Sequence, residues 1–363
     1  MLQDKIINRA LSTAEPPIAT DRSRCVRMRF NKNTCSVCTT NCRSAAISVD
    51  GGVSIDEGKC THCMLCVSAC PSGCFLAVDE DFFVLLSKLR KTQNSVPHAV
   101  LGCKQARDTE AHEKTCCLGF LSEEHLIALA AYLHKPLSLN LTACGGCGNS
   151  FIVDTLKERI ESARTKTSFD VGEKIQVAEK KADLVFEDVA LDRRGFFQAL
   201  KTMTFTQVAG LIGDKDAEMP VSYTVKRLPL RRAILNSVVR KLSQGNAVMG
   251  ILQNYAFTVK AGSSCNNCFA CIGMCPTGAL KIRENAESPG LLFNASLCIG
   301  CGLCRDFCPG QAVSVSPGFL GSNFFEHDLC NVSSLFKGEA RWGMGLSNKA
   351  GFPLDPSPPR PSR

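Results

Sequence analysis

The middle of the chain carries the longest regular alternation of apolar and polar positions. Apolar residues recur every three to four positions over 81–93, 121–133 and 151–163, a spacing that predicts three amphipathic helices. Two nearly continuous apolar runs, at 98–103 and 137–141, predict buried strands. Because strands and helices alternate, the sequence predicts a small α/β unit of the βαβ type.

The segments on both sides of this unit are shorter and alternate with a period of two. Three of them follow turns of small residues, and further short strands are expected at 53–56 and 291–294. Asp50-Gly51-Gly52 precedes the first of these and predicts a hairpin. Short strands mixed with helices predict the α+β class.

The rest of the chain carries weaker patterns. A polar stretch from Thr165 to Lys181 is expected to loosen the chain. Beyond it we expect a strand at 182–186, a helix at 196–212 and a basic helix from Pro229 to Leu242, where proline suits the first helical position. The Pro-rich residues 353–363 are expected to be disordered.

The unusual feature of the composition is its cysteine content, which bears on the function more than on the fold. The 363 residues are 45% hydrophobic and 21% charged, which is ordinary for a globular chain, but 23 of them are cysteines. The number is odd and the cysteines form tight groups, which argues against a disulfide framework and for a reducing compartment, hence the cytoplasm. We see no secretory signal and no apolar run of about 18 residues, so no membrane span is expected.

The cysteine groups repeat one spacing. The run Cys-x2-Cys-x2-Cys-x3-Cys-Pro begins at Cys60, Cys265 and Cys298, and a looser copy begins at Cys25. In the looser copy nine residues separate the first two cysteines, and Arg43 replaces the proline. A loop whose cysteines recur every third residue can curl several thiolates around one compact inorganic core.

Residues 265–309 resemble a bacterial-type 2[4Fe–4S] ferredoxin, and residues 25–71 resemble a variant of it. The resemblance implies four [4Fe–4S] clusters with crossed ligation, in which each fourth cysteine joins the neighbouring cluster. The implied ligand sets are Cys265, Cys268, Cys271 and Cys308; Cys275, Cys298, Cys301 and Cys304; Cys42, Cys60, Cys63 and Cys66; and Cys25, Cys35, Cys38 and Cys70. For the last set, a three-cysteine site or Cys74 as a ligand is an open alternative.

The predicted α/β unit carries cysteines of its own. Cys103 ends the first strand, Cys116 and Cys117 precede a helix, and Cys144 and Cys147 follow the second strand. Parallel strands end at one edge of a sheet, so these positions are expected to converge. We expect Cys103, Cys117, Cys144 and Cys147 to hold a fifth iron–sulfur cluster or zinc, with free thiols as the other alternative. The pattern loosely resembles the delta-type iron–sulfur subunits of hydrogenase and heterodisulfide reductase complexes.

The net charge and the absence of cofactor-binding motifs bear on two further function classes, nucleic-acid binding and organic-cofactor binding. The net charge of +8 would be offset by four clusters of about −2 each, and no aromatic–basic interleaving points to nucleic acid. No G-x-G-x-x-G follows a strand and no P-loop is present, so no organic cofactor is expected.

The sequence therefore predicts an α+β fold with two dicluster ferredoxin-like modules flanking a small α/β (βαβ) unit. The expected divisions are 25–80, 81–165, 166–252, 253–318 and a partly disordered tail, 319–363. The expected function is single-electron transfer with redox protein partners, without an enzymatic activity of its own. The alternatives are a reductase whose reactive site is the middle cysteines, and a cluster-bearing scaffold subunit.

Overall fold

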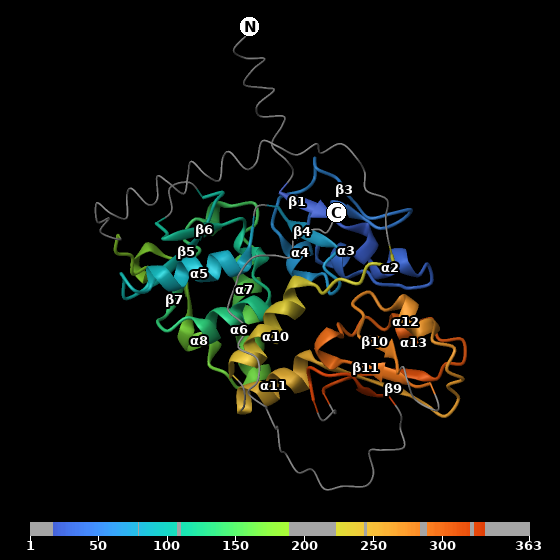
Figure 1. The fold of residues 1–363 in the computed structure, drawn as a ribbon. Helices are drawn as coiled ribbons and strands as arrows, with labels where there is room; N and C mark the ends of the chain where they lie inside the picture. The colour runs from blue at the N-terminus through green and yellow to red at the C-terminus, as the bar shows by residue number, and fades with distance from the viewer. Residues whose placement is uncertain are drawn as a thin grey trace, which may run out of the picture.

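The computed structural model describes residues 17–78, 80–106, 110–188, 223–242, 245–283, 289–319 and 323–330. Figure 1 shows a group of short elements near the N-terminus (blue), a sheet with covering helices (cyan to green) and a second group of short elements (orange). The mixed helix and strand content confirms the predicted α+β class. The expected helix at 196–212 and the Pro-rich tail lie outside the described residues.

The N-terminal group is made of two antiparallel strand pairs and three helices of one turn. The pairs are β1 with β4 and β2 with β3, and the last pair is the expected hairpin, with positive φ at Gly51 and Gly52. Its elements are β1 (Ile18–Thr20), α2 (Val26–Arg29), α3 (Val37–Asn41), β2 (Ile47–Ser48), β3 (Ser54–Ile55), α4 (Leu65–Ala69) and β4 (Phe75–Ala77).

The middle of the chain forms a four-stranded sheet of order β6-β5-β7-β8, in which every neighbouring pair is parallel. Asp81 caps the first helix through its carboxylate, and Ser122 forms a capping box with His125 at the start of the helix of residues 123–132. The elements are α5 (Phe82–Thr92), β5 (Ala99–Cys103), β6 (Glu113–Thr115), α6 (Glu123–Tyr132), β7 (Leu137–Asn140), α7 (Ile152–Thr167), α8 (Val171–Lys174) and β8 (Ile175–Ala178).

The C-terminal group follows two longer helices, and its strands pair antiparallel as β10-β11-β13 and β12-β9. In Figure 1 α10 lies between the green helices and the orange group. The elements are α10 (Leu230–Leu242), α11 (Asn246–Tyr255), β9 (Phe257–Ala261), α12 (Ala270–Met274), β10 (Leu280–Ile282), β11 (Leu291–Phe293), α13 (Leu303–Asp306), β12 (Val313–Pro317) and β13 (Asp328–Leu329).

The structure differs from the sequence prediction after residue 165. The polar stretch expected to loosen the chain contains the end of α7 and the strand β8, which pairs with β7 and extends the sheet to Ala178. The strand expected at 182–186 was wrong, because these residues form a short 3-10 turn (Lys181–Asp183) and a largely exposed loop. Because polar and charged residues lie within and around β8, its sequence does not show the alternation of apolar and polar positions that predicts a strand.

A buried carboxylate joins the helices at the centre of the molecule. Glu124, at the start of α6, is 5% exposed and accepts hydrogen bonds from Arg231 of α10 at 2.6 and 2.9 Å. Ser122 also donates to this carboxylate, at 2.6 Å. Although burial alone would raise it, the Arg231 charge and these hydrogen bonds lower the pKa of Glu124 to about 2. Arg231 therefore fixes α10 against α6 by charge as well as by packing.

Replacing Arg231 with Met should strongly destabilise the protein. The change keeps most of the side-chain length but leaves Glu124 buried without a cation, so we expect the free energy of unfolding to fall by about 3–5 kcal/mol. Urea titration of the anaerobically purified protein measures this. Arg164→Met is the matched control, because Arg164 pairs with Glu161 on an exposed helix face and its loss should change the stability little. Equal losses in the two variants would contradict the prediction.

Candidate metal centres

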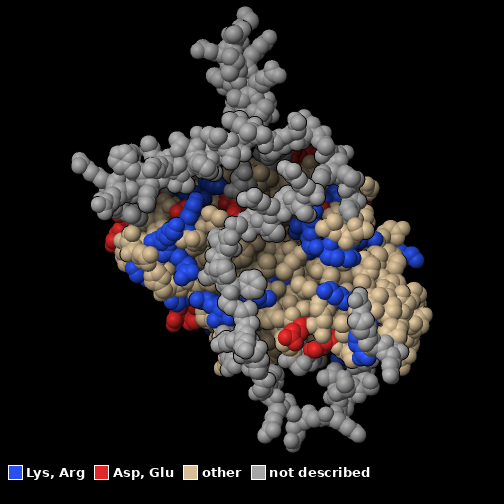
Figure 2. Space-filling model, in the orientation of Figure 1, with Lys and Arg blue, Asp and Glu red and all other residues tan. Residues whose placement is uncertain are grey.

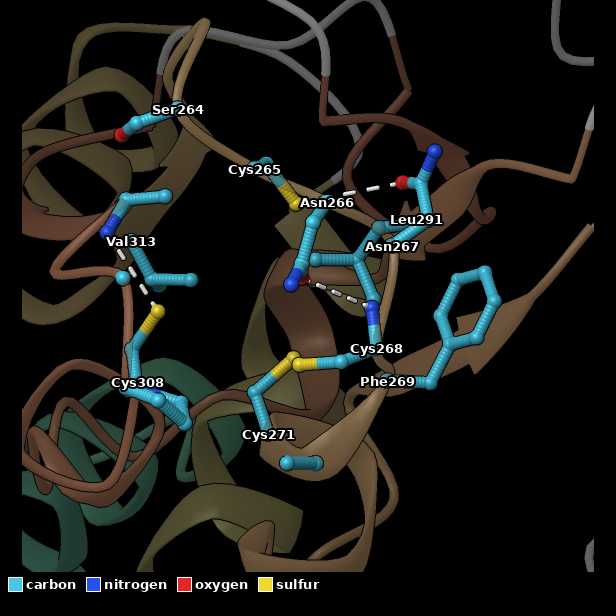
Figure 3. Close-up of a pocket in the computed structure, with 14 residues that line it drawn as sticks. Ser264, Cys265, Asn266, Asn267, Cys268, Phe269, Cys271, Leu291, Cys308 and Val313 are labelled. Carbon is cyan, nitrogen blue, oxygen red and sulfur yellow. Dashed lines mark hydrogen bonds between the residues drawn. The ribbon is translucent and has the colours of Figure 1, made fainter.

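A cavity in the C-terminal group is lined by four cysteines from two loops. Cys265, Cys268 and Cys271 reach it from the loop that runs into α12, and Cys308 reaches it from the turn after α13. Figure 3 shows these side chains around a common space, with Cys308 across from Cys271. These four residues are called the Cys308 site below. They are one of the sets expected from crossed ligation.

Two further cavities repeat this arrangement, each with three cysteines from one loop and the fourth cysteine of the other loop. They are called the Cys275 site and the Cys42 site. The Cys275 site comprises Cys275, Cys298, Cys301 and Cys304, and the Cys42 site comprises Cys42, Cys60, Cys63 and Cys66. The structure thus brings together three of the four expected ligand sets, each around its own cavity.

The fourth expected set, called the Cys70 site, comprises Cys25, Cys35, Cys38 and Cys70. Burial raises the pKa of Cys38 to about 11, and the neighbouring Cys70 and Cys25 thiols raise it further. Cys74 lies in the same group, because a hydrogen bond from its thiol lowers the pKa of Cys25 to about 6. Five cysteines therefore meet where four ligands are expected, and the choice between Cys25 and Cys74 stays open.

Three of the four cysteine loops curl in the same way. The residues immediately before and after the second cysteine of each loop have left-handed backbone angles. They are His62 and Met64, Asn267 and Phe269, and Gly300 and Gly302. A side chain larger than glycine adopts this conformation at a cost of about 1–3 kcal/mol, and such strain is concentrated at functional sites. The loop of Cys35 and Cys38 departs from the pattern, since Ser36 has a φ of −126°.

Backbone amides donate hydrogen bonds to the sulfur atoms of the fourth cysteines. The amide nitrogens of Ala46, Cys74 and Ala312 each lie 3.3 Å from the Sγ atom of the cysteine four residues earlier. In all four copies a residue with positive φ precedes this position, which turns the chain back toward the sulfur. These residues are Ala45, Gly73, Gly278 and Gln311. The arrangement favours thiolate over thiol, because a thiolate is the stronger acceptor.

Hydroxyl groups contact three of the four sulfur atoms of the fourth cysteines. Ser44, Ser72 and Thr277 stand two residues after the fourth cysteine, and their oxygens lie 3.5–3.6 Å from its sulfur. A thiolate carries no proton, so the hydroxyl donates once the cysteine is a metal ligand. Cys308 lacks this contact, because Gly310 occupies the equivalent position.

Burial makes several of these cysteines poor acids without a metal. It raises the pKa of Cys271 and of Cys298 to about 11 and that of Cys301 to about 12. At neutral pH these groups are therefore protonated in the metal-free chain. Iron ions lower thiol pKa values strongly, so binding releases the protons and compensates the buried negative charge. Buried thiols, inward amides and four-sulfur cavities together fit the iron–sulfur clusters implied by the sequence.

The middle cysteines meet at one edge of the parallel sheet, as expected from the strand order. Cys103 is the last residue of β5, Cys117 follows β6, and Cys144 and Cys147 follow β7. A hydrogen bond from Cys117 lowers the pKa of Cys103 to about 6, and burial raises that of Cys144 to about 11, with Cys103 and Cys147 adding to the rise. These four residues are called the middle site. Among the described residues no group of three or more His, Cys, Asp or Glu side chains is close enough to hold a single metal ion.

Cys116 differs from the four cysteines of the middle site. Burial raises its pKa to about 12, and the nearby Glu80 carboxylate contributes to the rise. Its amide donates to Glu80 at 2.8 Å, and its sulfur lies 3.7 Å from the Thr115 hydroxyl. Cys117 is only 7% exposed. Neither residue offers the accessible thiolate that a reductase at this position requires.

Comparison with known families agrees with the cysteine geometry. A 4Fe–4S dicluster domain model matches residues 264–315, and a 4Fe–4S binding domain model matches residues 53–76. The protein is 4Fe–4S ferredoxin-like. The matched segments contain all eight cysteines of the two C-terminal runs and the run that begins at Cys60. Iron–sulfur electron transfer is the function that these ferredoxin-type domains support.

Two curated relatives match over short stretches. Hydrogenase-4 component A of Escherichia coli K12 is 39% identical over 61 residues, which are 16% of this chain and 28% of the relative. Pyruvate synthase subunit PorD of Thermotoga maritima is 42% identical over 53 residues, which are 15% of this chain and 50% of the relative. The ferredoxin-like chain thus spans half or less of the relatives it matches. No helix in the described ranges is long and apolar enough to cross a membrane.

Removing iron and sulfide should unfold the cysteine loops before the parallel sheet. The loops at 60–70 and 265–275 lie in short elements with little core of their own, whereas the central strands β5 and β7 are almost entirely buried. Hydrogen exchange of the loaded and the anaerobically chelated protein measures this. We expect a large loss of protection in the loops and a small loss at Ala99–Leu101 and Leu137–Leu139. Equal loss in sheet and loops would contradict it.

Proposed function

We propose that this chain is a polyferredoxin that passes single electrons between four [4Fe–4S] clusters. The clusters would be held at the Cys308, Cys275, Cys42 and Cys70 sites. One observation carries the proposal: three separate cavities are each lined by three cysteines of one loop and the fourth cysteine of the other. Crossed ligation of this kind characterises two-cluster ferredoxins.

The chain's own residues prepare these sites for rapid electron transfer. Apolar side chains such as Ile299, Leu280 and Phe293 line the Cys275 site and exclude water. The strained loops and the amides directed at sulfur fix the ligand positions before a cluster binds. A bound cluster supplies a one-electron centre, and a rigid, dry surrounding keeps the rearrangement that accompanies each transfer small.

The middle site is proposed to hold a fifth iron–sulfur centre. Support comes from four cysteines at the carboxyl edge of a parallel sheet and from the amide of Asn149, which lies 3.4 Å from Cys147 Sγ. Zinc is the alternative occupant, since sites made of four cysteine thiolates also hold zinc, but a single ion would require these side chains to move closer together. The loose resemblance to delta-type subunits is consistent with an iron–sulfur centre here.

We further propose that two dicluster modules, near 25–80 and 253–318, flank the α/β unit, whose sheet reaches Ala178. Residues 223–252 connect that unit with the C-terminal module, and the tail follows residue 318. A one-electron carrier needs a donor and an acceptor, so redox proteins are the expected partners. The names of the relatives, which describe a hydrogenase component and a pyruvate synthase subunit, favour a role as a subunit. All 23 cysteines are free, which suits the reducing cytoplasm.

Iron and acid-labile sulfide content tests the proposal. Four cubane clusters correspond to about sixteen irons per chain, and a fifth iron–sulfur centre adds to that number. We expect Cys144→Ser to lose the added iron and sulfide only, because Cys144 belongs to the middle site alone. Elemental analysis with a sulfide assay after anaerobic reconstitution measures both.

Cys330→Ser is the matched control for that experiment. Cys330 is buried near the Cys308 site but belongs to none of the proposed ligand sets, so its loss should leave the iron content unchanged. A wild-type protein without sulfide would overturn the proposed function. Zinc in place of the additional iron would overturn only the fifth cluster.

Replacing Ser72 with Ala should lower the reduction potential of the Cys70 site. The variant removes the hydroxyl that lies 3.5 Å from Cys70 Sγ, and this hydrogen bond favours the more negative, reduced state. A hydrogen bond to a charged group contributes about 1.5–3 kcal/mol, and about 1.4 kcal/mol corresponds to roughly 60 mV for one electron. Since only the difference between oxidation states counts, we expect a fall of tens of millivolts. EPR-monitored redox titration measures it.

Ser44→Ala provides the comparison for Ser72→Ala. It removes the equivalent hydroxyl contact from Cys42, at 3.6 Å, so it should shift the potential of the Cys42 site instead. A shift of the same signal in both variants would contradict the assignment of the two fourth cysteines to different clusters.

A further inference from the structure

One segment of the chain contacts the loops of a fourth cysteine in each of the two cysteine-bearing modules. The segment that runs into α10 touches both loops: the amide of Arg227 donates to Pro276 at 3.1 Å, and the Arg231 guanidinium donates to Ala69 at 3.0 Å. Pro276 follows Cys275 and Ala69 precedes Cys70, so this segment bridges the loops of the Cys275 and Cys70 sites. In Figure 1 α2 of the blue group lies beside α12 and α13 of the orange group.

Arg29 lies at this junction. It belongs to α2, which begins directly after Cys25, and its guanidinium donates to the Ser23 and Tyr223 carbonyls at 2.8 and 3.0 Å. Burial lowers the pKa of Arg29, while the Cys275 and Cys301 thiols across the junction oppose that shift. Next to it, the Phe30 and Phe307 rings pack edge to face with centroids 5.4 Å apart. Figure 2 shows Lys and Arg side chains gathered where the two groups meet. A cation on the helix that begins next to Cys25 therefore stands near the Cys275 site, which is anionic when loaded.

The Cys42 site has a different neighbour. Gly119, two residues after Cys117, approaches the Cys63 carbonyl so closely that an added Cβ would lie 2.2 Å from its oxygen. Asn149, two residues after Cys147, donates to the Thr61 carbonyl at 2.9 Å. Both ligand loops of the middle site thus pack directly on the loop between Cys60 and Cys63.

Further hydrogen bonds hold this second junction together. The Ser68 hydroxyl of α4 donates to the Gly119 carbonyl at 2.7 Å. The Arg159 guanidinium of α7 contacts the same carbonyl at 3.1 Å and the Ser68 hydroxyl at 3.0 Å. Within each module, one helical turn separates a ligand of one site from a ligand of the next: Cys66 and Cys70 in one, and Cys271 and Cys275 in the other.

We infer that the five cysteine sites form one unbranched relay in the order Cys308 site, Cys275 site, Cys70 site, Cys42 site, middle site. The inference rests on the proposed function and adds the path between the modules. One electron moves at each step, so one site is oxidised as its neighbour is reduced, and no proton transfer is required. A low-potential one-electron donor protein and an acceptor of higher potential would dock at opposite ends.

Exposure supports this assignment of the two ends. Cys268 of the Cys308 site is exposed, and Gly145, Gly146 and Gly148 of the middle site face open space. Cys70 and Cys275, whose loops are bridged by the segment at 227–231, are buried. Electrons can therefore enter and leave through the exposed loops of the terminal sites.

Arg29→Gln tests the junction between the modules. Removing a cation near two sites makes both harder to reduce, so one substitution in the N-terminal module should lower the potentials of the Cys70 and Cys275 signals together in EPR-monitored titration. The Cys308 and middle signals should stay in place. Arg164→Gln is the matched control, because Arg164 is exposed, pairs with Glu161 on α7 and is not adjacent in sequence to any proposed ligand. A shift confined to one module would overturn the order.

Cys144→Ser tests the terminal step by magnetic coupling. In the fully reduced protein, loss of the middle centre should reduce the spin–spin broadening of the Cys42 signal to the part that its other neighbour, the Cys70 site, contributes, and leave both C-terminal signals unchanged. Broadening lost from a C-terminal signal, or from none, would overturn the relay. Iron analysis of the same samples separates the two hypotheses: a wild-type chain without clusters refutes the proposed function, whereas assembled clusters with the wrong coupling refute the relay alone.

Discussion

The structure depends on bringing four thiolates together in a space from which water is excluded. A thiolate in such a place is unfavourable unless a cation compensates it, and burial accordingly raises the pKa of Cys271, Cys298 and Cys301 well above neutrality. Only a positively charged iron core makes the arrangement stable, because it replaces the thiol protons. The left-handed residues at Met64 and Phe269 show that the backbone accepts strain to keep this geometry.

Cysteine spacing and periodicity predicted much of this from the sequence. The helices at 82–92 and 123–132 and the strand ending at Cys103 follow from local patterns. The crossed ligand sets were implied by the family resemblance, and three of them line cavities. The convergence of Cys103, Cys117 and Cys144 followed from a general rule about parallel sheets, since neighbouring strands deliver their carboxyl ends to one edge. Where a short motif or one topological rule decides the arrangement, residues far apart in sequence can be placed together.

The sequence was less informative where tertiary contacts decide the outcome. Strand β8 has only four residues, of which two are buried, so its sequence shows little alternation of apolar and polar positions. Pairing with β7 is what stabilises these residues as a strand. The left-handed positions of the cysteine loops are occupied by Gly300 and Gly302 in one copy but by His62 and Met64 in another. Glycine in the sequence therefore predicts the left-handed backbone in some of the loops and not in others. No local signal predicts that Cys74 lies against Cys25, because the antiparallel pairing of β1 with β4 brings their segments together.

The net charge of +8 also acquires a structural explanation. Arg159, Arg231 and Arg232 each bond backbone carbonyls inside the protein and lie near Cys63, Cys70 and Cys298, respectively. Cations at these positions oppose the negative charge that clusters would bring, and their carbonyl contacts keep them fixed in either oxidation state. Fixed cations between successive anionic sites lower the repulsion between neighbouring reduced centres. In the proposed relay, these arginines of α7 and α10 would set the electrostatic conditions under which an electron moves from one site to the next.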